Sequence, residues 1–200
     1  MRVRYVGNCL RSASPNASPG EAAARASATE PVPEWRGPSV DDVPDPVGFL
    51  NPPFSPLAYI ETERGTIEVE LAILDAPVTV ANFMSLAREG FYDGLPVHRV
   101  VSDFVVQGGD PHGDGMGGPP YTIRDEINEL PYLRGTVGMA LSGPDTGGSQ
   151  FFITHSPQPH LDGTYTVFGR VTDGMSVVDG LLQGDVVQAI RIWDGISPFD

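Results

Sequence analysis

Apolar and polar residues alternate along two neighbouring segments of the chain. The first runs over residues 57–63 (LAYIETE), the pattern breaks at Arg64-Gly65, and it resumes over residues 66–73 (TIEVELAI). A period of two places successive side chains on opposite faces of a strand, and a glycine-containing break between two such runs is typical of a turn. The pattern therefore predicts a β-hairpin over residues 57–73.

A helical spacing follows the hairpin. Asp75-Ala76-Pro77 begins it, and proline is tolerated in the first turn because the N–H that it lacks has no partner there. Glycine commonly follows the last turn of a helix, so Gly90 marks its end. We predict a helix between these points whose buried face carries Val80, Phe83, Met84 and Ala87.

Six further segments have the patterns of strands, and one has the pattern of a short second helix. The strand segments are 97–101, 104–108, 135–141, 149–154, 165–171 and 186–193, and the helix is 174–182, capped by Asp173. Residues 109–134 contain many Gly and Pro and predict a long ordered loop. Because strands and helices do not alternate, the predicted fold is mainly β: a closed eight-stranded antiparallel β-barrel capped by two helices.

The first 56 residues differ in composition from the rest of the chain. They hold 10 of the 20 prolines, are rich in Ala, Ser and Glu, and have only scattered aromatic residues. Such a segment buries too little apolar surface to offset the loss of chain entropy on folding. We predict a flexible tail or linker over residues 1–56, of which 35–56 is the part suited to pack on the domain. The folded domain is predicted over 57–196 and a C-terminal tail over 197–200.

The charge is strongly acidic and unevenly distributed. The formal net charge is −14: residues 1–56 carry 5 Arg against 6 acidic residues, and residues 57–200 carry 7 against 20. An acidic surface repels nucleic acid and anionic membranes, so we expect neither as a partner. We expect a monomer.

Two absences narrow the possible chemistry. All 12 basic residues are Arg, so mechanisms that use a lysine amine, such as Schiff bases, Ser-Lys dyads and the phosphate-binding P-loop, are excluded. Cys9 is the single cysteine, which excludes an internal disulfide, a CxxC redox pair and a cysteine-rich zinc site.

No apolar run approaches the roughly 18 residues of a membrane span or forms the apolar core of a signal peptide. We therefore expect a cytoplasmic protein.

Three segments carry distinctive motifs: VHRVVSDFVVQGGDP (97–111), GTVGMALSGPDTGGSQFFIT (135–154) and HLDGTYTVFGRV (160–171). Their order and spacing, together with the opening hairpin and Ala81-Asn82-Phe83, resemble the signature segments of the cyclophilin family of peptidyl-prolyl cis–trans isomerases. The resemblance extends over essentially all of residues 57–196. It implies a cyclophilin-like fold and an isomerase that rotates X-Pro bonds in peptides and in unfolded or partly folded proteins, assists protein folding and needs no cofactor.

The resemblance also implies which residues act. Arg99 stands in the position of the family's catalytic arginine, and Phe104 and Gln107 join it as catalytic residues. A guanidinium stays charged and presents a rigid fork of donors, which suits it to stabilise a twisted amide. The residues that the resemblance assigns to substrate binding are His98, Val105, Ala140, Leu141, Gln150, Phe152, His160, Leu161 and Tyr165. Adjacent residues of a strand point to opposite faces, so if Phe152 lines a groove, Phe151 packs in the interior.

Four of these positions depart from the family's common residues. His160 stands where eukaryotic members commonly have Trp, and Tyr165 where many have His. Val105 replaces a usual Met, and Leu141 a usual Asn. We expect isomerase activity to remain intact and cyclosporin to bind weakly, because the Trp indole supplies a key contact to that inhibitor.

Other interpretations of the chain are less well supported. Asp110, His112 and Asp114 have the spacing of alternating metal ligands, but no further ligand converges on them, and we predict a solvated loop and no metal. The histidines could suggest a hydrolase, but no GxSxG nucleophile motif is present, and His98 has an alternative role as strand scaffold. A module that binds proline segments without turnover as its role, and a structural or other enzymatic β-barrel, stay open as alternatives.

Overall fold

The computed structural model describes residues 55–195. Its strands are β1 (Leu57–Thr62), β2 (Gly65–Leu71), β3 (Leu95–Pro96), β4 (Arg99–Val101), β5 (Val105–Gly108), β6 (Thr136–Met139), β7 (Phe151–Thr154), β8 (Val167–Asp173) and β9 (Val186–Trp193). Its helices are α2 (Pro77–Arg88), α3 (Met175–Gly180) and the 3-10 turn η2 (Pro159–Leu161). Except for Ser55 and Pro56, the tails predicted over residues 1–56 and 197–200 lie outside the described residues.

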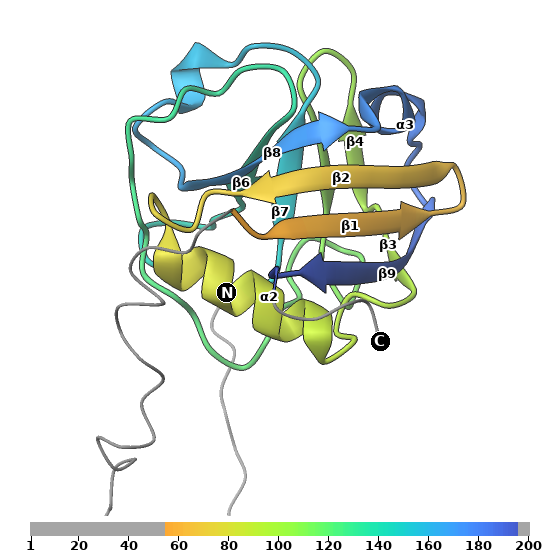
Figure 1. Cartoon of the computed structure of the whole chain (residues 1–200), viewed down its shortest axis with the longest axis horizontal. Helices are drawn as coiled ribbons and strands as arrows, with labels where there is room; N and C mark the ends of the chain where they lie inside the picture. Colours follow the sequence, from red (N-terminus) through yellow and green to blue (C-terminus); the bar gives the residue numbers. More distant parts are fainter. Residues whose placement is uncertain (1–54, 196–200) are drawn as a thin grey trace, which may run out of the picture. The chain divides into compact units, whose positions relative to one another are not determined.

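All nine strands belong to one antiparallel sheet in the order β3-β9-β1-β2-β8-β6-β7-β5-β4. The sheet curls, so that β7 passes behind β1 and β2 (Figure 1). Between residues 55 and 195, no strand ladder joins the two ends of the sheet, β3 and β4. The sheet is thus an open, curled one of nine strands, and the predicted closed eight-stranded barrel is wrong in both respects.

The additional strand, β3, was not predicted for a simple physical reason. β3 contains only two residues, which is too short to produce an alternating pattern, and one of them is Pro96, which has no N–H to donate. It pairs with β9 at the edge of the sheet, where a proline is tolerated.

The predicted hairpin is confirmed. β1 and β2 pair antiparallel with Ala58 opposite Val69 and Ile60 opposite Ile67, and all four of these side chains are buried. The residues between them, such as Glu68, lie on the outer face. The alternation in the sequence therefore reports which face of the hairpin covers the core.

The first predicted helix is also confirmed, as α2. Pro77 occupies its first turn, and Gly90 follows its end with a φ of +70°, a conformation that glycine adopts without steric cost. The buried ring of Phe83 lies 5.2–5.5 Å from the rings of Tyr92, Phe151 and Phe168. Figure 1 shows α2 lying across the sheet below β1 and β9, where this face closes the main core.

The second helix, α3, begins differently from the prediction. Asp173 is the last residue of β8 rather than the helix cap, and its carboxylate accepts only the N–H of Gly174 within this turn. Gly174 is the N-cap residue, with a φ of +82°. A Cβ at this position would lie 2.4 Å from the carbonyl oxygen of Thr66, so the close approach of β2 requires a glycine.

The remaining predicted strands are confirmed, β9 with the predicted ends and the others with different ends. Most are shorter than predicted, whereas β8 starts later and continues to Asp173. Residues 109–134 form the predicted loop, with a single bridge between Ile123 and Gly147 as its sheet-like contact. Among the described residues, no helix has the length and apolar character needed to cross a membrane.

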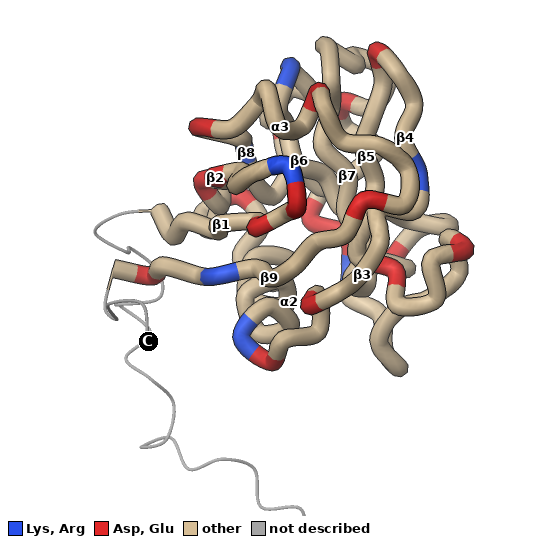
Figure 2. Tube along the Cα trace, turned by 90° about the vertical axis from the view of Figure 1, so that its right-hand side faces the viewer, with Lys and Arg blue, Asp and Glu red and all other residues tan. Residues whose placement is uncertain are grey.

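Acidic side chains are spread widely over the described part. Figure 2 shows Asp and Glu on strands, loops and helix ends, with few arginines between them. Five arginines form ion pairs with carboxylates: Arg64, Arg88, Arg134, Arg170 and Arg191. Arg99 is not one of them, and its side chain is directed to other partners.

Candidate active site

Nine of the predicted site residues line one groove of about 210 Å³, which we call the Arg99 groove. They are Arg99, Phe104, Val105, Gln107, Ala140, Leu141, Phe152, Leu161 and Tyr165. The strands that carry or precede most of them, β4, β5, β7 and β6, are neighbours in the sheet. The fold therefore brings residues that are up to 66 positions apart in the sequence to one surface.

The apolar wall of the Arg99 groove is preorganised by aromatic contacts. Phe152 belongs to a buried cluster with Val105, Leu161 and Val167, and its ring meets Tyr165 edge-on at 5.9 Å. Its neighbour Phe151 packs in the main core instead. This confirms the prediction that the two phenylalanines point to opposite faces of β7, with Phe152 on the groove side.

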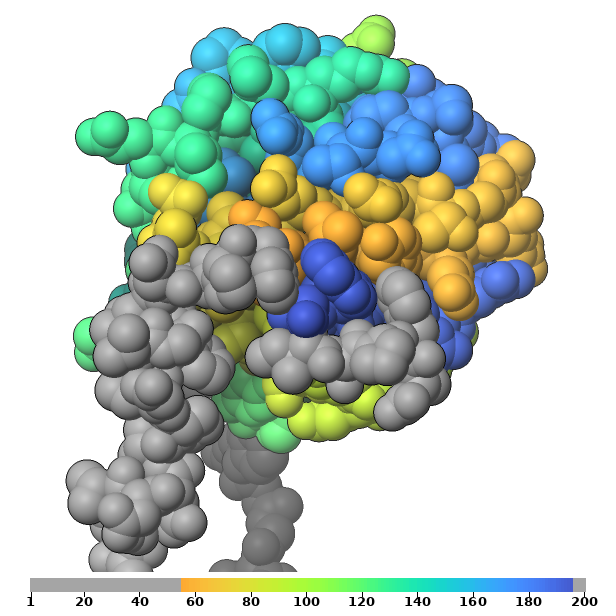
Figure 3. Space-filling model, in the orientation of Figure 1, coloured from red at the N-terminus to blue at the C-terminus, as the bar shows by residue number. Residues whose placement is uncertain are grey.

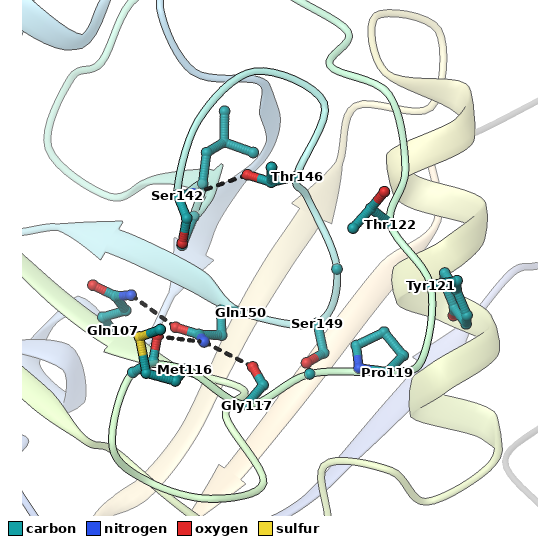
Figure 4. Close-up of a pocket in the computed structure, with 15 residues that line it drawn as sticks. Gln107, Met116, Gly117, Pro119, Tyr121, Thr122, Ser142, Thr146, Ser149 and Gln150 are labelled. Atoms are coloured by element: carbon teal, nitrogen blue, oxygen red, sulfur yellow. Dashed lines mark hydrogen bonds between the residues drawn. The ribbon is translucent and has the colours of Figure 1, made fainter. Parts of the chain in front are cut away.

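Arg99 is held by a chain of side-chain hydrogen bonds. Its Nη1 donates to Oε1 of Gln107 at 3.2 Å, and Nε2 of Gln107 donates to Oε1 of Gln150 at 3.1 Å. Gln150 in turn donates to the carbonyl oxygens of Gly115 and Gly117 at 3.1 and 2.8 Å, as Figure 4 shows from Gln107 to Gly117. These neutral partners orient the guanidinium without neutralising its charge.

An aromatic ring gives Arg99 a second support. Its guanidinium carbon lies 5.5 Å from the ring centroid of Phe104, within the range of a cation–π contact. The imidazole of His160 stacks on the same phenylalanine, with ring centroids 5.7 Å apart. His160 is not one of the residues that line the Arg99 groove, so in this structure it contacts the site through Phe104.

A second groove of about 220 Å³, the Gln150 groove, adjoins the first. The two share Gln107, Ala140 and Leu141 as a common wall. Its other walls come from the loops over residues 115–122 and 142–149, and Met116 is 83% exposed at its margin. The sequence prediction included Gln150 and the three shared residues but missed the two loops that form the rest of this groove, for which the only signal was the dense Gly and Pro content.

Tyr132 is a further residue that the sequence analysis missed. It is buried, and its ring stacks on Phe152 with centroids 5.6 Å apart and an angle of 20° between the planes. Burial raises the pKa of its hydroxyl well above the usual value, so the hydroxyl stays protonated and donates to the carbonyl oxygen of Thr166 at 3.3 Å. Gly138 makes room for this stack: a Cβ there would lie 2.3 Å from the Tyr132 hydroxyl and 2.6 Å from the Phe152 ring.

His98, like His160, is a predicted substrate-binding residue that lines neither of the two grooves. Both of its ring nitrogens are buried and have no hydrogen-bond partner among the described residues. Desolvation lowers the pKa of the imidazole, while the nearby charge of Asp110 opposes the shift. A neutral, half-buried ring fits the alternative role as part of the strand scaffold better than contact with a substrate.

The candidate metal ligands Asp110, His112 and Asp114 do come together, with one ligand atom of each within 4.8 Å of the others. The fully buried carboxylate of Asp110, however, already accepts the backbone N–H of His112 at 2.8 Å and that of Gly115 at 2.5 Å. Burial alone would raise the pKa of this carboxyl, but the N–H donors of His112, Gly115 and Gly113 hold it below its usual value. Asp110 therefore serves to order the loop that supports Gln150.

Comparisons with known proteins agree with this geometry. A family model described as "Cyclophilin type peptidyl-prolyl cis-trans isomerase/CLD" matches residues 57–194. Over 137 residues the chain is 54% identical to a peptidyl-prolyl cis-trans isomerase of Synechococcus elongatus, covering 68% of this chain and 94% of the relative. It is 56% identical over 137 residues to peptidyl-prolyl cis-trans isomerase B of Bacillus subtilis, covering 67% and 96%.

A solved structure shows the same similarity. The crystal structure of a cyclophilin type peptidyl-prolyl cis-trans isomerase of Cryptosporidium parvum, in the presence of the dipeptide Ala-Pro, superimposes with a TM-score of 0.65 at 34% identity. The match covers 68% of this chain and 98% of that one.

Proposed function

The chain belongs to the family of cyclophilin-type peptidyl-prolyl cis–trans isomerases, and we propose that it rotates X-Pro bonds in the Arg99 groove. One observation carries this assignment. A guanidinium without a carboxylate partner among the described residues, fixed by Gln107 and Phe104, lies beside an apolar socket formed around Phe152.

The reaction requires little conventional chemistry. Amide resonance sets a barrier of about 18–20 kcal/mol to rotation, and no bond is made or broken as the peptide turns. In the twisted state the proline nitrogen becomes pyramidal and gains a localised lone pair. A group that binds this state better than either planar isomer lowers the barrier.

Arg99 is the group suited to this task. Its N–H donors can approach the localised lone pair of the twisted amide, an interaction that the planar amide cannot make. Because Gln107 and Phe104 already fix the guanidinium, little reorganisation is needed during rotation. The stabilisation is therefore specific to the transition state.

The apolar part of the Arg99 groove holds the proline ring. Phe152, Leu161 and Val105 are all largely buried and present a rigid surface next to the arginine. Tyr132 supports Phe152 from behind, so the ring of the substrate meets a wall that cannot rotate away. With the proline ring held in place, rotation about the X-Pro bond moves only the residues that precede the proline.

The neighbouring Gln150 groove would take the residues that precede the proline. It shares a wall with the Arg99 groove, so one extended chain can contact both grooves. We propose that the substrates are extended proline-containing segments of peptides and of unfolded or partly folded proteins. The Cryptosporidium parvum relative was crystallised in the presence of the dipeptide Ala-Pro, which supports this class of ligand.

A titration with a short Ala-Pro peptide tests the proposal. Amide signals of the Arg99 groove should shift, and exchange spectroscopy should show cis and trans signals of the peptide interconverting at catalytic protein concentrations. The same peptide with Ala in place of Pro is the matched control and should do neither. Shifts without accelerated interconversion would favour the binding module instead of the enzyme.

A further inference from the structure

A third groove, of about 290 Å³, lies away from the two already described. We call it the Leu133 groove; its lining shares no residue with theirs. It is bordered by β2, by β8 and by the segment 130–133, which meet on the face drawn in Figure 3 in gold, blue and green.

The surface of the Leu133 groove is largely apolar. Leu71, Leu130, Pro131 and Val167 contribute to its walls, and Leu133 itself is 55% exposed. The charged groups on its border include Glu70 and Arg170, which pair with each other at 3.4 Å. An apolar hollow whose border carries one ion pair and the carboxylate of Asp75 is suited to an apolar segment rather than to an anionic ligand.

The described part of the chain begins at this groove. Ser55 is one of the lining residues, and the N–H of Leu71 donates to the carbonyl oxygen of Pro56 at 2.8 Å, which fixes the chain against β2. The residue before Ser55 is Phe54, whose Cα is about 3.8 Å away across one peptide unit. The sequence that leads to this point is Phe49-Leu50-Asn51-Pro52-Pro53-Phe54.

We propose that the Leu133 groove binds the chain's own segment Phe49–Phe54. Three of its six residues are large and apolar, which matches the lining of the groove. The covalent connection at Ser55 makes binding intramolecular, so the effective concentration of the segment is high. Pro52 and Pro53 restrict the free chain, which lowers the entropy lost on binding.

The docked segment would lie behind the active site. Leu130 and Val167 line the Leu133 groove and also pack in the cluster of Val105, Phe152 and Leu161. A segment bound there covers the rear of the cluster whose front forms the proline socket. The N-terminal segment thus becomes a part of the folded domain.

A nitroxide label on the full chain tests the proposal. In a Cys9→Ser background, the label is attached to Asn51→Cys, and its broadening of backbone amide signals is measured. We expect strong broadening at Leu130, Leu133 and Val167. Phe54→Ser should largely abolish this broadening, because it removes the apolar side chain nearest to the groove. Leu133→Ser should do the same from the side of the groove, and it changes a side chain that is exposed. Tyr5→Ser, which removes an aromatic residue far upstream, is the matched control and should leave the broadening unchanged.

Two results would overturn the proposal. One is broadening that stays the same in Phe54→Ser and in Leu133→Ser, because proximity along the chain alone would then account for it. The other comes from mixing nitroxide-labelled chains with isotope-labelled chains that carry no nitroxide. Broadening of the groove amides in that mixture would show that the occupant is a second copy of the chain.

Discussion

Phe152 is positioned by what lies behind it as much as by its own strand. Tyr132 stacks on its ring, and Gly138 leaves the space in which the two rings meet. We predict that Gly138→Ala displaces one of the rings, because an added Cβ would lie 2.6 Å from Phe152. Overpacking of this kind costs about 1–3 kcal/mol of folding stability. Peptide affinity should fall as well, since the proline socket changes shape.

Gly143→Ala is the matched control for this change. A Cβ at Gly143 meets no atom within 4 Å, so stability and affinity should stay near those of the wild type. Urea denaturation measures the first and peptide titration the second. Equal behaviour of the two alanine variants would contradict the role assigned to the Tyr132–Phe152 stack.

The second prediction for a single residue concerns His160 and the binding of cyclosporin. It stacks on Phe104 with a ring that is smaller than an indole and lacks the indole's fixed donor. We expect cyclosporin to bind the wild type weakly and His160→Trp to recover part of the affinity. Isothermal titration of both proteins with the drug measures this. Tight, stoichiometric binding by the wild type would show that the substitution at this position is not what limits affinity.

At the level of elements, the loop over residues 109–134 depends on one buried carboxylate. The hydrogen bonds from His112, Gly115 and Gly113 to Asp110 hold its pKa below the usual value despite burial, which acts in the opposite direction. Asp110 therefore contributes stability at pH values above its unfolded pKa of about 3.9. That contribution is lost as the pH falls through the still lower folded pKa.

The lowered pKa of Asp110 leads to a prediction about unfolding in acid. Asp110→Asn should lower the free energy of unfolding at pH 7, and its stability should depend less on pH below about pH 4 than that of the wild type. Asp114→Asn, at an exposed position of the same loop, is the control and should lower the free energy of unfolding at pH 7 less than Asp110→Asn does. Parallel acid profiles for Asp110→Asn and the wild type would contradict the account.

The elements that the sequence predicts well are those with a local pattern. The β1–β2 hairpin and α2 follow directly from periods of two and of three to four residues. β3 could not be predicted, because two residues with a proline carry no pattern. Closure of the sheet could not be predicted either, because it depends on pairing between strands and not on any one segment.

The residues of the candidate site also fall into those that the sequence predicts and those that it does not. The motif resemblance located the nine lining residues of the Arg99 groove, and alternation in β7 separated Phe151 from Phe152. Tyr132 was missed because its role depends on a contact between a loop and a strand 20 positions apart. His98 and His160 lie beside the site rather than in the groove, a difference that only the packing of side chains reveals.

At the level of the whole molecule, the composition predicts that the N-terminal region is not uniform. Residues 1–34 contain little that could form a core, whereas the proline-rich stretch that follows has apolar anchors. We predict that a chain starting at Trp35 has the melting temperature and the isomerase activity of the full chain. Calorimetry and a peptide assay measure both. Failure of this shortened chain to fold would show that residues 1–34 belong to the domain.

The central claim is that Arg99 acts on the twisted amide rather than on the bound peptide. Removing one preorganised donor of this kind typically lowers the rate by roughly 10²–10³, or about 2.7–4 kcal/mol. Arg99→Ala should therefore lose about that factor in interconversion rate with little change in peptide affinity. Arg99→Lys should recover only part of the rate, because an ammonium lacks the planar fork.

Phe152→Ala provides the contrast, since it removes apolar contact made by ground and transition states alike and should weaken affinity together with rate. The decisive measurement is the rate of cis–trans interconversion of the bound proline peptide, obtained by NMR exchange spectroscopy and paired with a titration for affinity. The account predicts a slow Arg99→Ala variant that still binds. An Arg99→Ala variant that isomerises the peptide as fast as the wild type would contradict it.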